Sequence, residues 1–293
     1  MNWLFENPRL RLFLGAALIS LSPVWVKLVD VSATTSGFYR VFIGSLALGA
    51  YLLVTRRSMR MSSRIWWLLI LTSVFFALDL WFWHRSILYI GPGLSTLLAN
   101  FQVFIMMAAG FLFLRQPLKT AHFVAVPLAV IGLGLIVGFD LQALQPEYRA
   151  GVIFGLLTAC AYAGYLLSLR ASRAGSTDRM PNREIFIISV LTAVFLGLSA
   201  VAEGESLALG GQDLGWLLCY GVLSHTLGHL FIASSLPHVS TTQAGLALLL
   251  QPTLSFAWDV LLFARPMTNQ ELLGASVALV AIYLGSRPSS KQA

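Results

Sequence analysis

The sequence predicts an all-α membrane protein of ten transmembrane helices, arranged as two inverted repeats of five helices. Composition is the first reason: 57% of the 293 residues are hydrophobic, only 11% are charged, and the mean hydropathy is +0.79. The second is spacing, because the charges gather in short gaps between apolar runs of about 20 residues, the helix length that crosses a bilayer core of about 30 Å. The third is that the pattern of the first half recurs in the second half.

The apolar runs are those of helices and not of barrel strands. Runs such as VFIGSLALGAYLLV and AVPLAVIGLGLIVG show no alternation with a period of two, which membrane strands of about 10 residues require. The first run is too long for a signal peptide and lacks a small-residue cleavage site, so we expect a retained helix there. Ten spans follow: 10–29, 34–54, 65–84, 93–114, 121–138, 151–170, 184–202, 214–235, 242–263 and 271–286.

The internal repeat is clearest in the stretch Asp79–Pro117, which forms two apolar segments around a Gly-Pro-Gly turn. Its outline returns 149 residues later without a gap. We therefore expect a first repeat over 1–138, a linker over 139–150 and a second repeat over 151–293. The matched positions are Phe82 and Phe231, Ser86 and Ser235, Leu97 and Leu246, Gln102 and Gln251, and Pro117 and Pro266.

Topology follows from the loops. Of the 19 Lys and Arg residues, 14 fall on the side that carries the N-terminus, so the positive-inside rule predicts that both termini are cytoplasmic. Five helices that start inside end outside, so the second repeat runs in the opposite sense. Inverted repeats of this kind hold the central site of many transporters. Because the excess of positive charge reflects topology, it does not predict nucleic-acid binding.

Several motifs together resemble a known family. They are FYRVFIG around Arg40, SILYIGPGLSTLLANFQVF, LLLQPTLSFAWDVLLFARPMT and LLGASVALVAIYLG. With the ten-span layout, they are similar to the EamA-type branch of the drug/metabolite transporter superfamily, and in particular to bacterial exporters of aromatic and other neutral amino acids. The resemblance implies a multi-pass protein of the bacterial inner membrane. The chain departs from that pattern at Gln116 and Arg265, where the family often has an acidic residue, and at Val103, where it often has proline.

Polar and aromatic side chains within the spans mark a predicted central cavity, because a polar group in lipid is costly unless it meets a partner or water. In span 3, Phe76, Asp79 and Trp83 fall on one helical face. In span 9, Gln251 precedes Pro252, which frees a backbone carbonyl. The full predicted cavity set is Trp25, Phe76, Asp79, Trp83, Asn100, Gln102, Tyr162, Tyr165, His225, His229 and Gln251.

Structural roles compete with this interpretation. The amides could join helices, the two histidines could be satisfied packing residues, and Trp66, Trp67, Trp81 and Trp216 suit the lipid interface. The histidine pair lacks a third ligand, so we expect no metal. Asp79 could pair with Arg85, Arg40 or water. We expect the charged groups of Arg40, Lys27 and Asp259 to extend outward to the membrane boundary.

A largely uncharged cavity with aromatic and amide groups suits a small zwitterionic or neutral solute with an apolar part, such as a neutral amino acid. We predict export by alternating access, without a cofactor, by a monomer. The chain contains no P-loop, so transport is either passive or coupled to protons through Asp79, His225 or His229. The alternatives are an exporter of drugs or quaternary cations and a metabolite importer. A lipid enzyme is disfavoured, since the loops show no H-x-x-x-H, D-D-x-x-D or G-x-S-x-G pattern.

Overall fold

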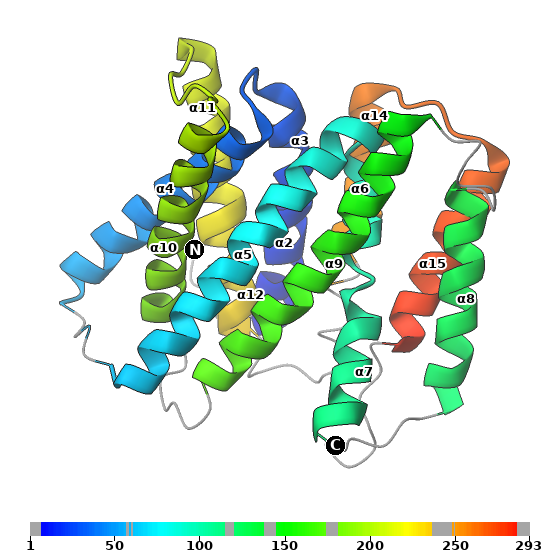
Figure 1. The fold of residues 1–293 in the computed structure, drawn as a ribbon, viewed down its shortest axis with the longest axis horizontal. Helices are drawn as coiled ribbons and strands as arrows, with labels where there is room; N and C mark the ends of the chain where they lie inside the picture. The colour runs from blue at the N-terminus through cyan, green and yellow to red at the C-terminus, as the bar shows by residue number, and fades with distance from the viewer. Residues whose placement is uncertain are drawn as a thin grey trace.

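The fold is helical throughout the part of the chain that the structure, a computed structural model, describes (Figure 1). Among these residues every regular element is a helix, and the helices occupy the ten predicted spans, which confirms the predicted class of an all-α membrane protein. Outside the described part lie residues 139–144 of the predicted linker 139–150, and also Gln116, Pro117 and Leu246. The described residues are 7–56, 59, 61–114, 120–137, 145–173, 181–235, 248 and 250–285.

The helices of the first half are continuous in three spans and broken in two. Spans 1 and 4 each consist of two consecutive helices that meet end to end. In chain order the elements are α2 (Pro8–Ser20), α3 (Ser22–Leu28), α4 (Ala33–Val54), α5 (Ser63–Ile90), α6 (Pro92–Ala99), α7 (Gln102–Leu114) and α8 (Thr120–Val137).

The helices of the second half follow the same sequence of spans. The eighth span contains a π-helical segment, labelled η1, between two α-helices, and the described part of the ninth span is α14. The elements are α9 (Pro146–Ser172), α10 (Asn182–Ala202), α11 (Gly211–Cys219), η1 (Tyr220–Gly228), α12 (His229–Ser235), α14 (Leu250–Phe263) and α15 (Asn269–Gly285).

Local chemistry accounts for the two breaks in the first half. Pro23 lies in the first turn of α3 and has no N–H to donate to the preceding turn, so the chain starts a new helix there. The second break follows Asn100, whose Nδ2 donates to the Thr96 carbonyl at 2.8 Å. This side chain takes an acceptor near the end of α6, and short polar side chains of this kind compete with helical hydrogen bonding.

The helix surfaces match a lipid environment. Seven of the described helical segments are long and apolar enough to cross a bilayer. Large apolar side chains point outward, among them Leu53, Val54 and Leu261, which are 81%, 84% and 72% exposed. Such exposure is unfavourable in water and neutral in lipid, so the outer surface belongs in a membrane.

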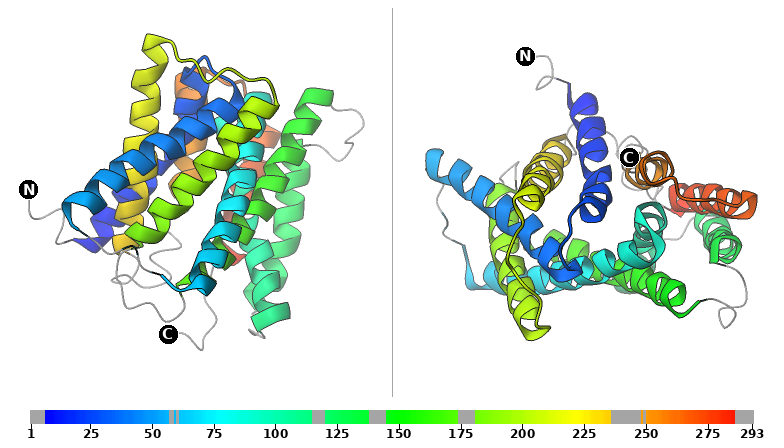
Figure 2. Two further views of the ribbon diagram at one scale, coloured as in Figure 1. Left: turned by 60° about the vertical axis from the view of Figure 1, so that its left-hand side comes forward. Right: turned by 90° about the horizontal axis from the view of Figure 1, so that it is seen from above.

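The two halves pack as a pair related by a two-fold pattern of helix contacts. Span 2 packs on span 7 (α4 on α10), span 4 on span 9 (α6 on α14) and span 5 on span 10 (α8 on α15). Span 3 packs on span 6 (α5 on α9), and the equivalent pair, span 8 with span 1 (η1 and α12 on α2), is also in contact. Exchanging the halves therefore maps each of the first three contacts onto itself and exchanges the last two with each other. Figures 1 and 2 show α8 and α15 side by side at one edge of the molecule.

The halves run in opposite directions. One end of the molecule, which we call the acidic end, contains Asp30, Arg85, Glu203, Glu205 and Asp213. The end of α5 and the start of α11 are both at this end, since Arg85 contacts Glu203 and the Asp30 amide donates to Asp213 Oδ1 at 2.9 Å. Because α5 and the segment α11–η1–α12 are equivalent third helices, their opposite directions show the inversion (Figure 1).

Hydrogen bonds join the two halves across the acidic end. Arg85 Nη2 donates to Glu203 at 2.6 Å, and the Thr34 hydroxyl donates to the same carboxylate at 2.8 Å. The Ser32 hydroxyl donates to Glu205. The Tyr39 hydroxyl donates to the Leu207 carbonyl at 2.7 Å. The segment after α10 is thereby fastened to α4 and α5.

Candidate functional site

A cavity of about 80 Å³ lies between the halves, with walls from both. Its size exceeds the roughly 10–15 Å³ that a single water requires. Seven of the eleven predicted cavity residues line it, which brings together side chains from five of the spans. They are Phe76, Asp79, Trp83, Asn100, Tyr162, His229 and Gln251, and the remaining lining residues are Ile19, Ser22, Arg40, Thr96, Ala99 and Thr158.

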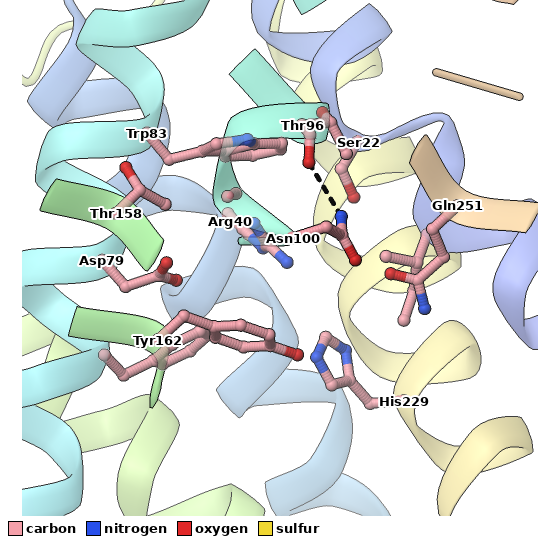
Figure 3. A pocket seen from close by; sticks show the side chains of 13 residues that line it. Ser22, Arg40, Asp79, Trp83, Thr96, Asn100, Thr158, Tyr162, His229 and Gln251 are labelled. Carbon is pink, nitrogen blue, oxygen red and sulfur yellow. Dashed lines mark hydrogen bonds between the residues drawn. The ribbon is translucent and has the colours of Figure 1, made fainter. Parts of the chain in front are cut away.

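The broken helices shape this cavity. Ser22 stands at the start of α3, and Ala99 and Asn100 stand at the end of α6, so both breaks of the first half face it. Figure 3 shows Trp83 and Tyr162 on opposite sides, with Asp79 between them and His229 and Gln251 across the cavity. The arrangement provides two aromatic walls and several polar groups around a small volume.

Arg40 was expected to extend to the membrane boundary, and this prediction was wrong. The side chain is only 5% exposed and lines the cavity. Its guanidinium lies over three rings, with the carbon at 5.1 Å from the centroid of Tyr220, 5.5 Å from Trp83 and 6.0 Å from Phe76. Cation–π attraction of this kind is strongest in a desolvated setting, which explains why the charge is held inward.

A directed chain of hydrogen bonds holds Arg40. Its Nη1 donates to the Tyr220 hydroxyl at 3.1 Å, and this hydroxyl lies 3.2 Å from His84 Nε2. His84 Nδ1 lies 2.7 Å from the Leu80 carbonyl, which can only accept. The chain therefore places the His84 proton on Nδ1 and leaves Nε2 to accept from Tyr220. Neutral His84 thus fixes the orientation of Tyr220, and Tyr220 fixes that of Arg40.

Four of the predicted cavity residues do not line the cavity, and two of them support its wall by stacking on Phe76. Tyr165 stacks on Phe76 with a centroid distance of 4.7 Å, and His225 stacks on the same ring at 6.1 Å. Trp25 donates to Ser224 at 3.0 Å. Gln102 begins α7, and its Oε1 is buried without a hydrogen-bond partner among the described residues.

The π-helix contains both Tyr220 and His225. Thr226 Oγ1 donates to the carbonyl of Gly221, five residues earlier, at 3.0 Å. A π-segment shifts the side chains that follow it around the helix axis, and such segments often occur at functional sites. Here η1 presents Tyr220 to Arg40 and lets His225 reach Ser189, whose hydroxyl lies 2.8 Å from His225 Nε2.

Asp259 was also expected to reach outward, and it does not. It is 2% exposed, and its Oδ2 accepts from the Gly93 amide at 3.0 Å and lies 3.7 Å from Arg265. An acidic group at the first turn of a helix meets the partial positive charge of the free N–H groups. Asp259, from the second half, therefore caps α6 of the first half.

Comparison with known proteins assigns the chain to a family. The family description for EamA-like transporters matches residues 10–138 and again residues 149–287, which together cover nearly all of the sequence. The chain belongs to the EamA-like transporter family. The two matched regions show that this drug/metabolite transporter has duplicated halves, and the family is one of transporters and not of enzymes.

One similar solved structure is titled only "Crystal structure of protein". It superposes with a TM-score of 0.67 at 14% identity, covering 96% of this chain and 97% of the other. That likeness shows a shared fold. No curated protein matches the sequence of this EamA-like transporter.

No cluster of three or more His, Cys, Asp or Glu residues that could hold a metal occurs among the described residues of the transporter. Its cavity instead combines one arginine, one aspartate, one histidine and two amides. Sequence reasoning missed Arg40, Tyr220 and His84. The signal for Arg40 was available, because an intramembrane arginine marks a functional site by default.

At the acidic end of the transporter, the Glu203 carboxylate accepts hydrogen bonds from residues of both halves. Burial alone would raise the pKa of the Glu203 carboxyl, but hydrogen bonds from Trp81, Ser199 and Thr34, together with the charge of Arg85, lower this pKa to about 2. Trp81 Nε1 donates to Glu203 at 2.6 Å, so this ring, expected in the lipid interface, belongs to the network. Arg85, a predicted partner of Asp79, binds Glu203 instead.

Proposed function

We propose that this EamA-like transporter exports neutral amino acids, including aromatic ones, by alternating access around the cavity. The observation that carries the proposal is the composition of the cavity wall, which offers aromatic faces beside one basic and one acidic side chain. Aromatic and aliphatic walls suit an apolar side chain, while charged and amide groups suit the ammonium and carboxylate of an amino acid.

The relation between the halves supports the proposed mechanism. A cavity built by two inverted repeats can be exposed to either side when one repeat rocks against the other. Small residues at the contacts permit such movement with close packing. Gly132 and Gly274 are an example, since a Cβ on Gly132 would lie 2.9 Å from the Gly274 carbonyl oxygen.

An exporter of quaternary cations is the second candidate, because Asp79 lies among aromatic rings in the same cavity. Arg40 argues against it. A buried guanidinium in the cavity would repel a cation that carries no negative group, and arginine does not lose its proton in proteins.

We further propose that the protein lies in the bacterial inner membrane with both termini in the cytoplasm, and that it works as a monomer. The acidic end would then face outward. The proposed orientation rests on the distribution of basic residues.

Counterflow in proteoliposomes tests the function. Vesicles loaded with unlabelled L-phenylalanine, L-leucine, a nucleoside or tetraethylammonium are diluted into the corresponding labelled compound, and transient accumulation is measured. We expect accumulation with the two amino acids only. Exchange of tetraethylammonium without exchange of amino acids would refute the proposal.

A further inference from the structure

We propose that Arg40 is the carboxylate subsite of the transporter and that Asp79 is its ammonium subsite. The inference rests on the proposed transport of amino acids and makes it specific: two groups within one cavity read the two charges of a zwitterion. It predicts that a substrate must carry both charges.

Arg40 has unused capacity to bind an anion. A guanidinium has five N–H donors, and Nη1 is used by Tyr220. The Nε atom is buried and has no hydrogen-bond partner among the described residues. Buried polar atoms in folded proteins are paired with few exceptions, so an unpaired donor on a cavity wall points to a partner that arrives with the ligand.

No carboxylate of the described chain neutralises this guanidinium at contact distance. Among the described residues, the acids that form ion pairs within 4.0 Å do so with other arginines: Glu203 and Glu205 with Arg85, Glu184 with Arg173, and Asp259 and Glu271 with Arg265. Asp79 shares the cavity with Arg40 without an ion pair between them. A charge held in a membrane interior is expensive, and a carboxylate from the solute would compensate it.

The guanidinium is held in a fixed position. Three aromatic rings surround it, and the Tyr220–His84 chain directs it. The planar fork of arginine binds a carboxylate through two parallel hydrogen bonds, which a flexible lysine ammonium does not reproduce. Ser22 adds a second unpaired group, since its buried hydroxyl lines the same cavity without a partner among the described residues.

Asp79 supplies the opposite charge. It is 7% exposed, lines the cavity, and forms no hydrogen bond or ion pair with the described residues. In Figure 3 its carboxylate points into the space between Trp83 and Tyr162, toward the side where Arg40 lies. An acceptor in this position suits an ammonium group, and the two rings beside it suit the apolar part of the solute.

The test compares three ligands that differ in one charge each. L-Phenylalanine carries both charges, L-phenylalaninamide lacks the carboxylate, and N-acetyl-L-phenylalanine lacks the ammonium. Competition with counterflow of labelled L-phenylalanine gives an inhibition constant for each. Because charged hydrogen bonds are lost, we expect both analogues to compete about 10- to 100-fold more weakly than L-phenylalanine.

Variants then separate the two subsites. In Arg40→Gln, we expect the preference for L-phenylalanine over its amide to fall to about onefold, while discrimination against the N-acetyl compound persists. Asp79→Asn should show the reverse. Arg149→Gln, at an exposed position on α9 away from the cavity, is the matched control and should keep both preferences.

If Arg40→Gln fails to fold, or folds but no longer transports labelled L-phenylalanine, a second variant and a binding measurement replace it. Arg40→Lys keeps the charge and loses the fork, and ligand-induced thermal stabilisation in detergent reports binding without transport. We expect Arg40→Lys to lose at least about tenfold of the preference over the amide. If either Arg40 variant keeps the full preference, or loses both preferences equally, the subsite assignment is wrong.

Failure of the proposed function leaves a different result. If the wild-type protein exchanges no amino acid, counterflow of 3-phenylpropionate tests Arg40 separately. Exchange that Arg40→Gln abolishes would support the carboxylate subsite without amino-acid transport. If neither amino acids nor 3-phenylpropionate exchange, both proposals are overturned.

Discussion

Gly44 in α4 provides a sharp test of how the π-helix is seated. A Cβ at this position would lie 2.2 Å from His225 Cδ2. Ordinary contacts between carbon atoms are about 3.5–4.0 Å, so Gly44→Ala forces the imidazole to recede by more than about 1 Å. The ring has little room, since its Nε2 is 2.8 Å from the Ser189 hydroxyl and it stacks on Phe76.

The expected cost combines three terms. Overpacking a well-filled interior costs about 1–3 kcal/mol, and loss of the hydrogen bond between Ser189 and His225 costs about 0.5–1.5 kcal/mol. Alanine is better than glycine within a helix by about 0.5–1 kcal/mol, which offsets part of this. We expect Gly44→Ala to lower the free energy of unfolding by about 2 kcal/mol.

Equilibrium unfolding in mixed detergent micelles measures this change. Gly215→Ala is the control, because Gly215 lies exposed in α11 and an added Cβ would meet nothing within 4 Å. It should leave stability unchanged or raise it by up to about 1 kcal/mol. In the double variant with His225→Ala the clash is removed, so the Gly44 substitution should lose most of its cost.

Two results would refute this reasoning. If the Gly44→Ala protein were as stable as the Gly215→Ala protein, His225 would not pack against α4 as described. An undiminished cost of Gly44→Ala in the His225→Ala background would place the clash elsewhere.

Three further predictions concern the acidic end, the turn before α6 and the proposed coupling groups. The pKa of Glu203 is lowered to about 2 from its ordinary value of 4.5, so the contribution of Glu203 to stability is complete above pH 4.5 and is lost as the pH falls toward 2. Thermal unfolding should show this loss of stability in the wild type and not in Glu203→Gln. Gly91 and Gly204 both have a positive φ, +84° and +71°, but an added Cβ would lie 2.7 Å from Asp259 Oδ2 at Gly91 and would meet open space at Gly204. Gly91→Ala should therefore lower the free energy of unfolding by about 1–3 kcal/mol more than Gly204→Ala. If protons drive transport through Asp79 or His225, Asp79→Asn and His225→Ala should flatten the pH dependence of counterflow, and full retention in both would exclude them.

Much of the fold could be predicted because hydrophobic length and charge spacing are dictated by the bilayer. The ten spans, the repeat and the inversion follow from apolar runs and from an odd number of helices in each half. The break in span 4 was not predicted. Asn100 interrupts span 4 without a proline, through a side-chain bond to Thr96 that helix propensity does not reveal.

The candidate site could be predicted only in part, since orientation around a helix depends on packing. Asp79, Trp83 and Asn100 reach the cavity as their positions suggest. Arg40 was assigned to the boundary because long side chains usually extend there, but three aromatic rings and Tyr220 hold it inside. These partners come from distant helices, and the π-segment that positions Tyr220 has no sequence signature.

Among the described residues, the ion-pair network at the acidic end has no equivalent at the positions that the repeat relates to Arg85 and Glu203, although the helices around it exist in two copies. Applying the repeat spacing of 149 residues, Ser234 stands where Arg85 does, and Val54 stands where Glu203 does. If the transporter works by the proposed alternating access, this network stabilises the arrangement seen here, because it joins α4 and α5 to the segment after α10. We therefore expect an uneven equilibrium in the absence of substrate, in which the conformation seen here is more populated than the alternative one, because the alternative breaks this network. The two halves would then share one architecture while the two states of the empty carrier differ in population.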